Sequence, residues 1–458
     1  MIFLQILFGL FGLGIMVFIH ELGHFIAAKM NGIVVEVFSL GWGPKMIGFT
    51  RGGTSYQISW FPIGGYCKMK GEIILKQPSE TGQAEPVWEK GSALAASPLA
   101  KICVSAFGPL FNLVSALLIF TLIWWAGFRI FSPDNRIVLA TDYTLTKFDS
   151  PPPATLAGLQ TGDRVIAING EPVENYDQIR ERILLSSRKN LLFKVERGSE
   201  TLELNVTPLL DKETGGGQIG IYAWYEPVID WVDGEGPAAL AGLRKGDRIL
   251  AVDGMRIELG MDIYEHLNTT KPARVSILFE RPGMAGELSE TITPTYGEDS
   301  IPDIGVGWAL NEYHSPRLTF GQALLKSLGE TVTTARITVE GIATLFQGIN
   351  LRNAVGGPAR IVYYAGSAAT SGFSFGFGPG VVGFFRFISF LSITLFLMNL
   401  LPIPATDGGQ ILLFLVELVR GRPVKPRTIG RFQYIGFSIL IALVIFFTFN
   451  DILFFLGR

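Results

Sequence analysis

Apolar and polar stretches alternate along this chain of 458 residues. Four long apolar segments, at about 2–27, 102–125, 381–401 and 435–456, each cover the roughly 20 residues that a helix needs to cross a bilayer. Between the second and third segments lies a long polar stretch with short, strand-like alternation. The pattern predicts an α-helical polytopic membrane protein with four transmembrane helices and a β-rich region outside the bilayer.

Basic residues set the expected orientation of these helices. The first apolar segment has no Lys or Arg before it and Lys29 after it, which favours a retained helix over a cleaved signal peptide. Lys and Arg gather in 28–101 and again in 420–431, and the positive-inside rule places both stretches in the cytoplasm. The stretch 129–378 and the C-terminus are then expected on the other side.

A repeat lies within that outer stretch. Residues 157–170 and 241–254 share a Gly-Asp turn, an alternating apolar run and a closing Asn-Gly or Asp-Gly turn. The duplication predicts two small β-rich modules; a repeat-built domain without a binding role is the alternative. Further on, 318–346 has apolar residues near helical spacing, which favours an amphipathic helix on the outer membrane surface over a plain core helix.

Short apolar runs also follow the first membrane segment. Residues 34–39, 56–61 and 66–69 predict three short strands separated by Gly-rich turns. The complete pattern divides the chain into a first span at 1–28, a membrane-associated β region at 29–100, a second span at 101–128, two modules at 129–213 and 214–312, a surface region at 313–378, a third span at 379–404, a cytoplasmic loop at 405–433 and a fourth span at 434–458.

Composition agrees with a membrane protein. Mean hydropathy is +0.36 and only 17% of residues are charged, which is too apolar for an ordinary soluble protein of this length. The net charge of -2 gives no indication of a nucleic-acid partner. Cys67 and Cys103 both precede the polar stretch, so a disulfide framework is excluded there.

Candidate chemistry lies inside the first apolar segment, at His20-Glu21-Leu22-Gly23-His24. The chain has only 4 His, and two of them fall here at i and i+4, on one face of the predicted helix. This spacing suits two ligands of a tetrahedral Zn²⁺ with the glutamate as general base. A buried polar cluster is the alternative, but ionisable groups at membrane depth are costly and indicate function.

A catalytic zinc site needs a third protein ligand. His266 and His314 both lie in the outer stretch, whereas Asp407 follows the third span near the predicted cytoplasmic side. Pro402 and Pro404 break the helix before it. An N-cap of a following helix is the alternative role for Asp407. Zn²⁺, two neutral imidazoles and the carboxylates of Asp407 and Glu21 sum to zero charge, which a low-dielectric site tolerates.

These motifs together resemble the site-2 protease family of intramembrane zinc metalloproteases. The resemblance runs along nearly the whole chain and is carried by five features, namely residues 20–24, 64–69, 108–112, the two PDZ-like repeats and 399–409. The family usually has Leu-Asp-Gly where this chain has Thr406-Asp407-Gly408. That departure leaves the aspartate in place.

The resemblance implies an enzyme of regulated intramembrane proteolysis in the bacterial inner membrane, with periplasmic PDZ-like domains and an active site near the cytoplasmic side. Such enzymes use Zn²⁺ to cut single-pass transmembrane proteins within the bilayer, after a first protease has removed the outer part of the substrate. An anti-sigma factor of an envelope-stress pathway and remnant signal peptides are the implied substrates.

The resemblance also implies roles for residues outside the metal site. Asn112 matches a motif asparagine that could bind the oxyanion or the substrate backbone, although an interhelical hydrogen bond is an equal alternative. Apart from the resemblance, the strands predicted at 34–39, 56–61 and 66–69 suggest that a sheet edge near the zinc could hold substrate as an added strand; an ordinary β-subdomain is the alternative. Further substrate contacts are implied for Gly64, Gly65, Tyr66, Asn353, Pro358 and Asn399.

Two questions remain open from the sequence. The PDZ-like modules could capture peptides, with 219–221 as a carboxylate-binding loop, or act as a size filter, which we favour. A non-catalytic membrane scaffold that binds partners through these modules is the main rival function. A metal transporter is a weaker rival, because polar residues on several spans and His-rich loops are missing from the sequence.

Overall fold

A computed structural model describes residues 2–71, 89–146, 148, 150–296, 302–345 and 355–456. The chain forms two compact units. One unit combines both ends of the chain, 1–129 and 314–458, and the other is the intervening stretch 130–313. Asn353 lies outside the described residues.

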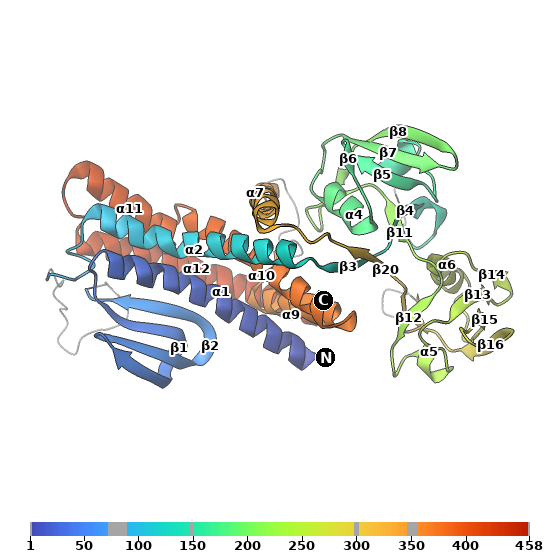
Figure 1. Cartoon of the computed structure of the whole chain (residues 1–458), viewed down its shortest axis with the longest axis horizontal. Coiled ribbons are helices and arrows are strands. Elements are labelled where there is room, and N and C mark those ends of the chain that lie inside the picture. The colour runs from blue at the N-terminus through green and yellow to red at the C-terminus, as the bar shows by residue number, and fades with distance from the viewer. Residues whose placement is uncertain are drawn as a thin grey trace. The chain divides into compact units, whose positions relative to one another are not determined.

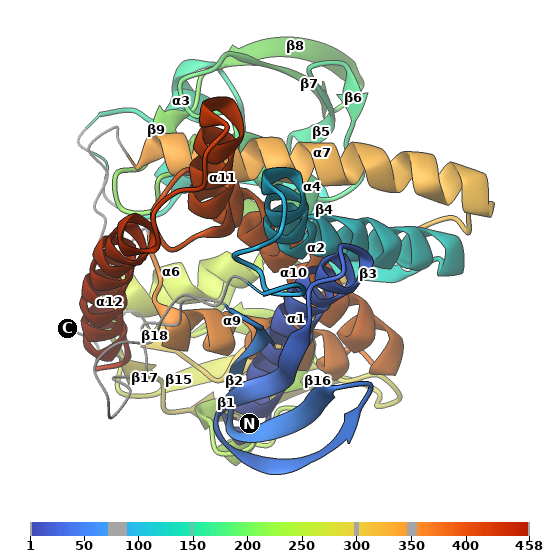
Figure 2. The same ribbon diagram turned by 90° about the vertical axis from the view of Figure 1, so that its left-hand side faces the viewer.

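Four long apolar helices form the first unit (Figures 1 and 2). Their bounds are Ile2–Met30 for α1, Pro98–Ala126 for α2, Phe377–Leu400 for α10 and Pro426–Phe455 for α12, and all four are long and apolar enough to cross a membrane. This confirms the four predicted spans. The last helix begins at Pro426, ahead of the predicted start of the fourth span at 434–435.

Three further helices connect the spans. α7 (Phe320–Thr344) packs against α2 and α10, and α9 (Pro358–Ser374) packs against α1 and α10. α7 shows an exposed apolar row that includes Leu325, Leu328 and Val332, as an amphipathic surface helix requires. The stretch 405–433, predicted as a loop, is mostly helical, because α11 (Asp407–Arg420) precedes α12.

A buried ion pair joins α9 to the C-terminal end of α12. The Arg360 Nε lies 2.7 Å from Asp451 Oδ1, and both side chains are almost fully buried. The Asp451 carboxylate also accepts hydrogen bonds from the backbone N–H groups of Gly357, Ala359 and Arg360. Asp451 therefore acts as an N-terminal cap of α9 although it belongs to another helix. Elsewhere α12 is largely exposed.

A curved antiparallel hairpin lies beside α1, made of β1 (Val35–Arg51) and β2 (Thr54–Met69) (Figure 1). Its register shifts repeatedly, so that Phe38 pairs with both Tyr56 and Cys67. The two long strands thus fold back into four short ones in the order 65–69, 35–40, 55–58 and 47–51. Three of these match the predicted strands. The prediction missed the fourth, whose exposed apolar residues hide the alternation of a half-buried strand.

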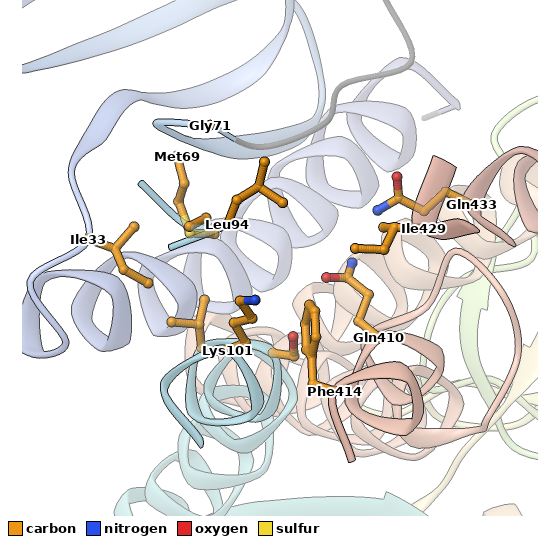
Figure 3. A pocket seen from close by; sticks show the side chains of 12 residues that line it. Ile33, Met69, Gly71, Leu94, Lys101, Gln410, Phe414, Ile429 and Gln433 are labelled. Atoms are coloured by element: carbon orange, nitrogen blue, oxygen red, sulfur yellow. The ribbon is translucent and has the colours of Figure 1, made fainter. Parts of the chain in front are cut away.

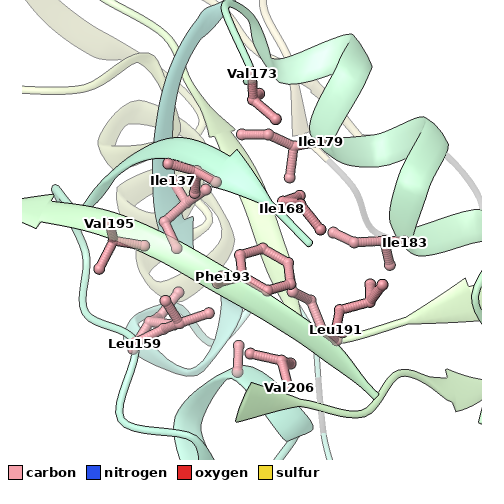
Figure 4. Packing of buried hydrophobic residues seen from close by; sticks show 14 residues of the cluster. Ile137, Leu159, Ile168, Val173, Ile179, Ile183, Leu191, Phe193, Val195 and Val206 are labelled. Carbon is pink, nitrogen blue, oxygen red and sulfur yellow. The ribbon is translucent and has the colours of Figure 1, made fainter. Parts of the chain in front are cut away.

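The second unit contains two modules built alike. The sheet of the first module has the strand order β11 (Ile221–Trp224), β4 (Asp134–Leu139), β5 (Arg164–Ile168), β7 (Leu191–Arg197) and β8 (Glu200–Val206). The helix α4 (Tyr176–Leu184) belongs to the same module. Its core gathers Ile137, Ile168 and Phe193 from three strands with Ile179 from the helix (Figure 4). The predicted boundary at 213 is therefore wrong, because β11 returns to pair with β4.

The second module repeats this plan. Its sheet has the strand order β14 (Met255–Arg256), β13 (Arg248–Val252), β15 (Val275–Glu280) and β16 (Glu287–Ile292). The strand pair β12 (Ile229–Val232) and β19 (Val306–Trp308) and the helix α6 (Gly260–Thr270) complete the module around one core. The repeated Gly-Asp turns have one structural role in both modules. Asp163 and Asp247, each almost completely buried, accept hydrogen bonds from Arg197 and Arg281 respectively.

Short elements complete the fold. β3 (Arg129–Ser132) pairs with β20 (Asn311–His314), so the stretch between them begins and ends at adjacent strands. The others are β6 (Glu171–Pro172), β9 (Leu209–Leu210), β10 (Gly217–Gln218), β17 (Thr295–Tyr296), β18 (Pro302–Asp303), α3 (Pro153–Leu156), α5 (Pro237–Leu240) and a 3₁₀ turn at Ala140–Asp142.

Candidate metal centre and its surroundings

Three predicted ligands lie together at the crossing of α1, α2 and α11. His20 and His24 occupy one face of α1, one turn apart, and each exposes only 8% of its surface. Asp407 is the first residue of α11, where the positive end of the helix dipole favours a carboxylate. Residues nearly 400 positions apart in the sequence thus form one cluster of potential metal ligands.

The spacing of the donor atoms matches a tetrahedral zinc site. The Nε2 atoms of His20 and His24 lie 3.2 Å apart, and Asp407 oxygens lie 3.2 Å and 3.4 Å from them. Ligand bonds of about 2.0–2.1 Å at tetrahedral angles require donor atoms about 3.3 Å apart. The residues present therefore fit Zn²⁺, and their two imidazoles and one carboxylate are ligand types that zinc prefers.

The segment before α11 shapes the position of Asp407. Thr406 caps the helix, since its hydroxyl accepts a hydrogen bond from the Gly409 N–H. The capping role considered for Asp407 is therefore wrong, and Thr406, the departure from the usual family motif, supplies that cap. A Cβ on Gly408 would lie 2.3 Å from the Leu400 carbonyl oxygen, so only glycine permits this close return of the chain.

Glycines also bring α1 and α2 into close contact at the site. A Cβ on Gly23 would lie 2.3 Å from the Phe107 carbonyl oxygen, and one on Gly108 would lie 2.3 Å from His24 Nε2. Pro109 follows within α2, where proline removes a backbone donor and bends a helix. The space for a metal between the two histidines therefore depends on the missing side chain of Gly108.

Glu21 lies between the ligands and the outer edge of the hairpin. Its carboxylate is hydrogen-bonded by the backbone of Cys67 in β2. A Cβ on Gly65 would be 3.4 Å from Glu21 Cγ, which shows how closely the strand 65–69 follows the motif helix. The strand 65–69 is an edge of the four-strand arrangement, and its backbone at Cys67 reaches the glutamate.

Asn112 contacts the metal cluster directly. It is fully buried in α2, and its Nδ2 lies 3.1 Å from His20 Nδ1. The other ligand is held in a similar way, because His24 Nδ1 lies 2.8 Å from the Val104 carbonyl oxygen. Both imidazoles thus have their second nitrogen engaged by α2, as is usual for histidine ligands of metals.

The remaining predicted residues have local contacts of their own. Gly64 in β2, with φ +87°, lies against the Trp42 ring, and the Tyr66 hydroxyl accepts a hydrogen bond from Gln57. Asn399 is in the last turn of α10, close in sequence to the break before α11. Pro358 is the exposed first residue of α9, beside the Asp451 cap. Their predicted substrate contacts stay predictions.

A cavity of about 80 Å³ lies near the centre and shares Val104, whose carbonyl oxygen faces His24 (Figure 3). It is lined in part by Val104, Gln410 and Phe414, and Lys101 projects into it. The Lys101 Nζ lies 2.9 Å from Glu417 Oε1, and both side chains are buried. Sequence reasoning missed this ion pair, because the two residues are 316 positions apart and neither belongs to a motif.

The chain is similar to known proteins over most of its length. The profile described as "Peptidase family M50" matches residues 8–443. A Treponema pallidum protein named "Putative zinc metalloprotease" is 33% identical, covering 98% of this chain and 99% of that protein. The zinc metalloprotease RasP of Geobacillus kaustophilus is 28% identical over 96% of this chain and 95% of its own length.

A solved domain structure is similar to part of the chain. The PDZ domain of the SdrC-like protein from Listeria monocytogenes aligns at 20% identity with a TM-score of 0.17, covering 19% of this chain and 90% of that domain. The family match extends over nearly the whole chain, and the relatives are named for zinc and for proteolysis. With its four apolar helices, this chain is a multi-pass membrane metalloprotease whose cofactor is Zn²⁺, and it belongs to peptidase family M50, the site-2 protease family.

Proposed function

We propose that this protein is an intramembrane endopeptidase that cuts transmembrane segments of single-pass membrane proteins, with His20, His24 and Asp407 as zinc ligands and Glu21 as general base. The observation that carries the proposal is the spacing of about 3.3 Å among the three donor atoms, with a glutamate one residue from the first histidine. All four residues belong to apolar helices or their immediate ends.

The residues divide the chemistry of hydrolysis among them. Bound by the three ligands, Zn²⁺ would supply Lewis-acid chemistry that activates water and polarises the scissile carbonyl. Glu21 accepts the proton of the attacking water and later delivers it to the leaving amine. The backbone of Cys67 orients the Glu21 carboxylate for both transfers.

The hairpin offers a way to present the substrate. A transmembrane helix hides its peptide bonds, so a segment must become extended before it can be cut. The edge strand 65–69 runs past Glu21, and an extended segment could pair with it through main-chain hydrogen bonds. Strand addition at this edge would place a peptide bond beside the catalytic glutamate.

The second unit fits a size filter better than peptide capture. In the first module, the Tyr176 hydroxyl of α4 donates a hydrogen bond to the Ile221 carbonyl at the start of β11, beside the candidate loop 219–221. In the second, Trp308 of β19 packs against Gly260 and Tyr264 of α6. A peptide bound between strand and helix would have to displace these contacts, so we propose that the modules exclude untrimmed substrates.

The cellular role proposed here follows from the family. The expected location is the bacterial inner membrane, with the second unit in the periplasm and the metal centre near the cytoplasmic side. The proposed substrates are anti-sigma factors already trimmed by a first protease, whose cleavage activates an envelope-stress response, and remnant signal peptides.

The deciding experiment is co-expression with a tagged single-pass substrate that lacks its outer domain. Glu21→Gln keeps the shape of the side chain and should lower the cleavage rate by about 10²- to 10⁴-fold, the usual contribution of a general base. The zinc content of the variant should equal that of the intact chain. Cleavage at an undiminished rate would show that Glu21 is not the base.

The same measurement separates the rival function. A membrane scaffold that only binds partners would show no cleavage with either chain and would have no requirement for zinc. The intact HExxH motif and the assembled third ligand favour the protease.

A further inference from the structure

The Asn112 side chain has an incomplete set of hydrogen bonds at the most critical place in the protein. It is fully buried, and its Nδ2 faces His20 Nδ1 at 3.1 Å. Its Oδ1 is buried without a hydrogen-bond partner among the described residues. A buried amide oxygen without a partner is costly, so this arrangement requires an explanation.

The imidazole protons decide which end of the amide faces His20. A neutral imidazole carries one N–H, and its other nitrogen can bind a metal. His24 Nδ1 faces a carbonyl oxygen, which can only accept, so His24 carries its proton on Nδ1 and its Nε2, without a proton, can bind a metal. His20 differs, because an amide N–H₂ facing its Nδ1 requires that nitrogen to accept.

With that amide orientation, the His20 proton must be on Nε2, the nitrogen that faces Asp407 at 3.2 Å. An Nε2–H donating to the Asp407 carboxylate gives a satisfied network, but it is one that cannot bind a metal through Nε2. Rotating the Asn112 amide by 180° exchanges its oxygen and nitrogen without changing its shape. Oδ1 then accepts from the His20 Nδ1–H, the His20 Nε2 can bind a metal, and the amide N–H₂ takes the position that has no partner among the described residues.

We propose that Asn112 is a positioning residue for the metal: its side-chain oxygen selects the His20 tautomer that binds zinc, and so sets the zinc affinity. The inference rests on the proposed metal site. It assigns Asn112 a role towards a ligand, whereas a contact with the oxyanion would be a role towards substrate. Outer groups that orient metal-binding histidines typically change metal affinity by 10- to 100-fold when they are removed.

Zinc affinity of the purified full-length protein in detergent, measured by competition with a chelator, tests this directly. Asn112→Leu keeps the approximate size but removes the acceptor, and it should weaken zinc binding by about 10- to 100-fold. Asn112→Asp restores an acceptor towards His20 and should bind at least as tightly as the intact chain. Thr121→Val is the matched control, because Thr121 is buried in the same helix but donates only to the Leu117 carbonyl.

A second readout reports the tautomer itself. The chain contains 4 His, so ¹⁵N-histidine labelling gives few signals, and His266 and His314 serve as internal references. In the zinc-loaded intact protein and in Asn112→Asp, His20 should be protonated on Nδ1. Equal zinc affinity in the intact protein, Asn112→Leu and Thr121→Val would overturn the inference while leaving the metal site intact. No zinc binding by the intact protein would overturn the metal site and this inference together.

Discussion

At the scale of single residues, the metal site depends as much on absent atoms as on ligands. Gly108 has no side chain where a Cβ would meet His24 Nε2 at 2.3 Å and His20 Cε1 at 3.0 Å. The neighbouring Gly23 allows the two helices to approach closely enough for α2 to engage both imidazoles. The backbone of α2 therefore forms one wall of the metal centre.

Gly108→Ala should accordingly abolish zinc binding without unfolding the protein. Alanine favours helix, so the local propensity of α2 improves by about 1 kcal/mol. The added methyl group, however, occupies the space between the ligands. Zinc content after purification is the measurement, and Gly14→Ala is the control, because a Cβ on Gly14 in α1 meets no atom within 4 Å. Normal zinc content in Gly108→Ala would contradict this description of the wall.

The sequence predicted the metal ligands and the general base, but not the residues that leave space for the metal. His20, Glu21, His24 and Asp407 could all be chosen from residue type, spacing and position in apolar segments. Gly108 was part of a recognised motif, but its role as empty space could not be inferred, because it depends on which helix packs against α1. The Asn112 contact with His20 depends on the same packing.

At the scale of elements, α11 connects the third ligand to α2. Asp407 begins this helix and Glu417 lies near its end, where it is paired with Lys101 in the first turn of α2. The pair is 5–6% exposed, so neither charge is well solvated. Lys101 also lines a cavity, as Figure 3 shows.

Breaking this ion pair should destabilise the protein more than removing both charges. Lys101→Met leaves a buried Glu417 carboxylate unpaired and should cost about 3–5 kcal/mol of unfolding free energy. The double variant with Glu417→Met should recover most of that loss, since a buried ion pair replaced by apolar groups is often neutral. Thermal unfolding with and without added zinc measures both effects. Equal destabilisation by the single and double variants would show that the Lys101 and Glu417 charges do not stabilise each other.

The outer edge of the hairpin gives a second prediction at this scale. Cys67→Pro removes a backbone N–H from the edge strand beside Glu21. We expect about tenfold slower cleavage from the loss of a hydrogen bond to a charged group, with unchanged zinc content. Cys67→Ala is the matched control, because it keeps the N–H and should cut at the normal rate. Slow cleavage in both variants would assign the effect to the side chain instead.

Short elements were harder to predict than long ones. The four spans follow from apolar length alone, whereas the fourth strand of the hairpin and the boundary after β11 depend on pairing between distant segments. A strand such as 47–51, with exposed apolar residues, has no alternation from which to be recognised.

At the scale of the whole molecule, the second unit is an insertion between two neighbouring strands. β3 leads into it and β20 leads out of it, and the two are paired. Each module has its own hydrophobic core. A unit with adjacent ends and independent cores can be removed with little effect on the rest of the fold.

Replacing 134–310 with a short Gly-Ser turn should therefore leave the metal centre intact and remove the proposed size filter. Substrates that keep their outer domain should then be cut, whereas the intact chain should cut only trimmed ones. The cleavage of both substrates by both chains is the measurement. If the shortened chain binds zinc and still rejects untrimmed substrate, selection lies elsewhere in the protein.

The capped end of α12 has a consequence for the lipids that suit this enzyme. Between Arg431 and the buried Asp451, the helix offers uncharged residues from 432 to 450, and at 1.5 Å per residue the rise from 432 to 450 is about 27 Å. A thicker bilayer would have to thin locally around this helix or strain the Arg360–Asp451 contact with α9. Either effect costs free energy that grows with the difference between bilayer thickness and helix length. The acyl-chain length of the surrounding lipid therefore becomes a variable of catalysis, to be matched to the enzyme like temperature or pH.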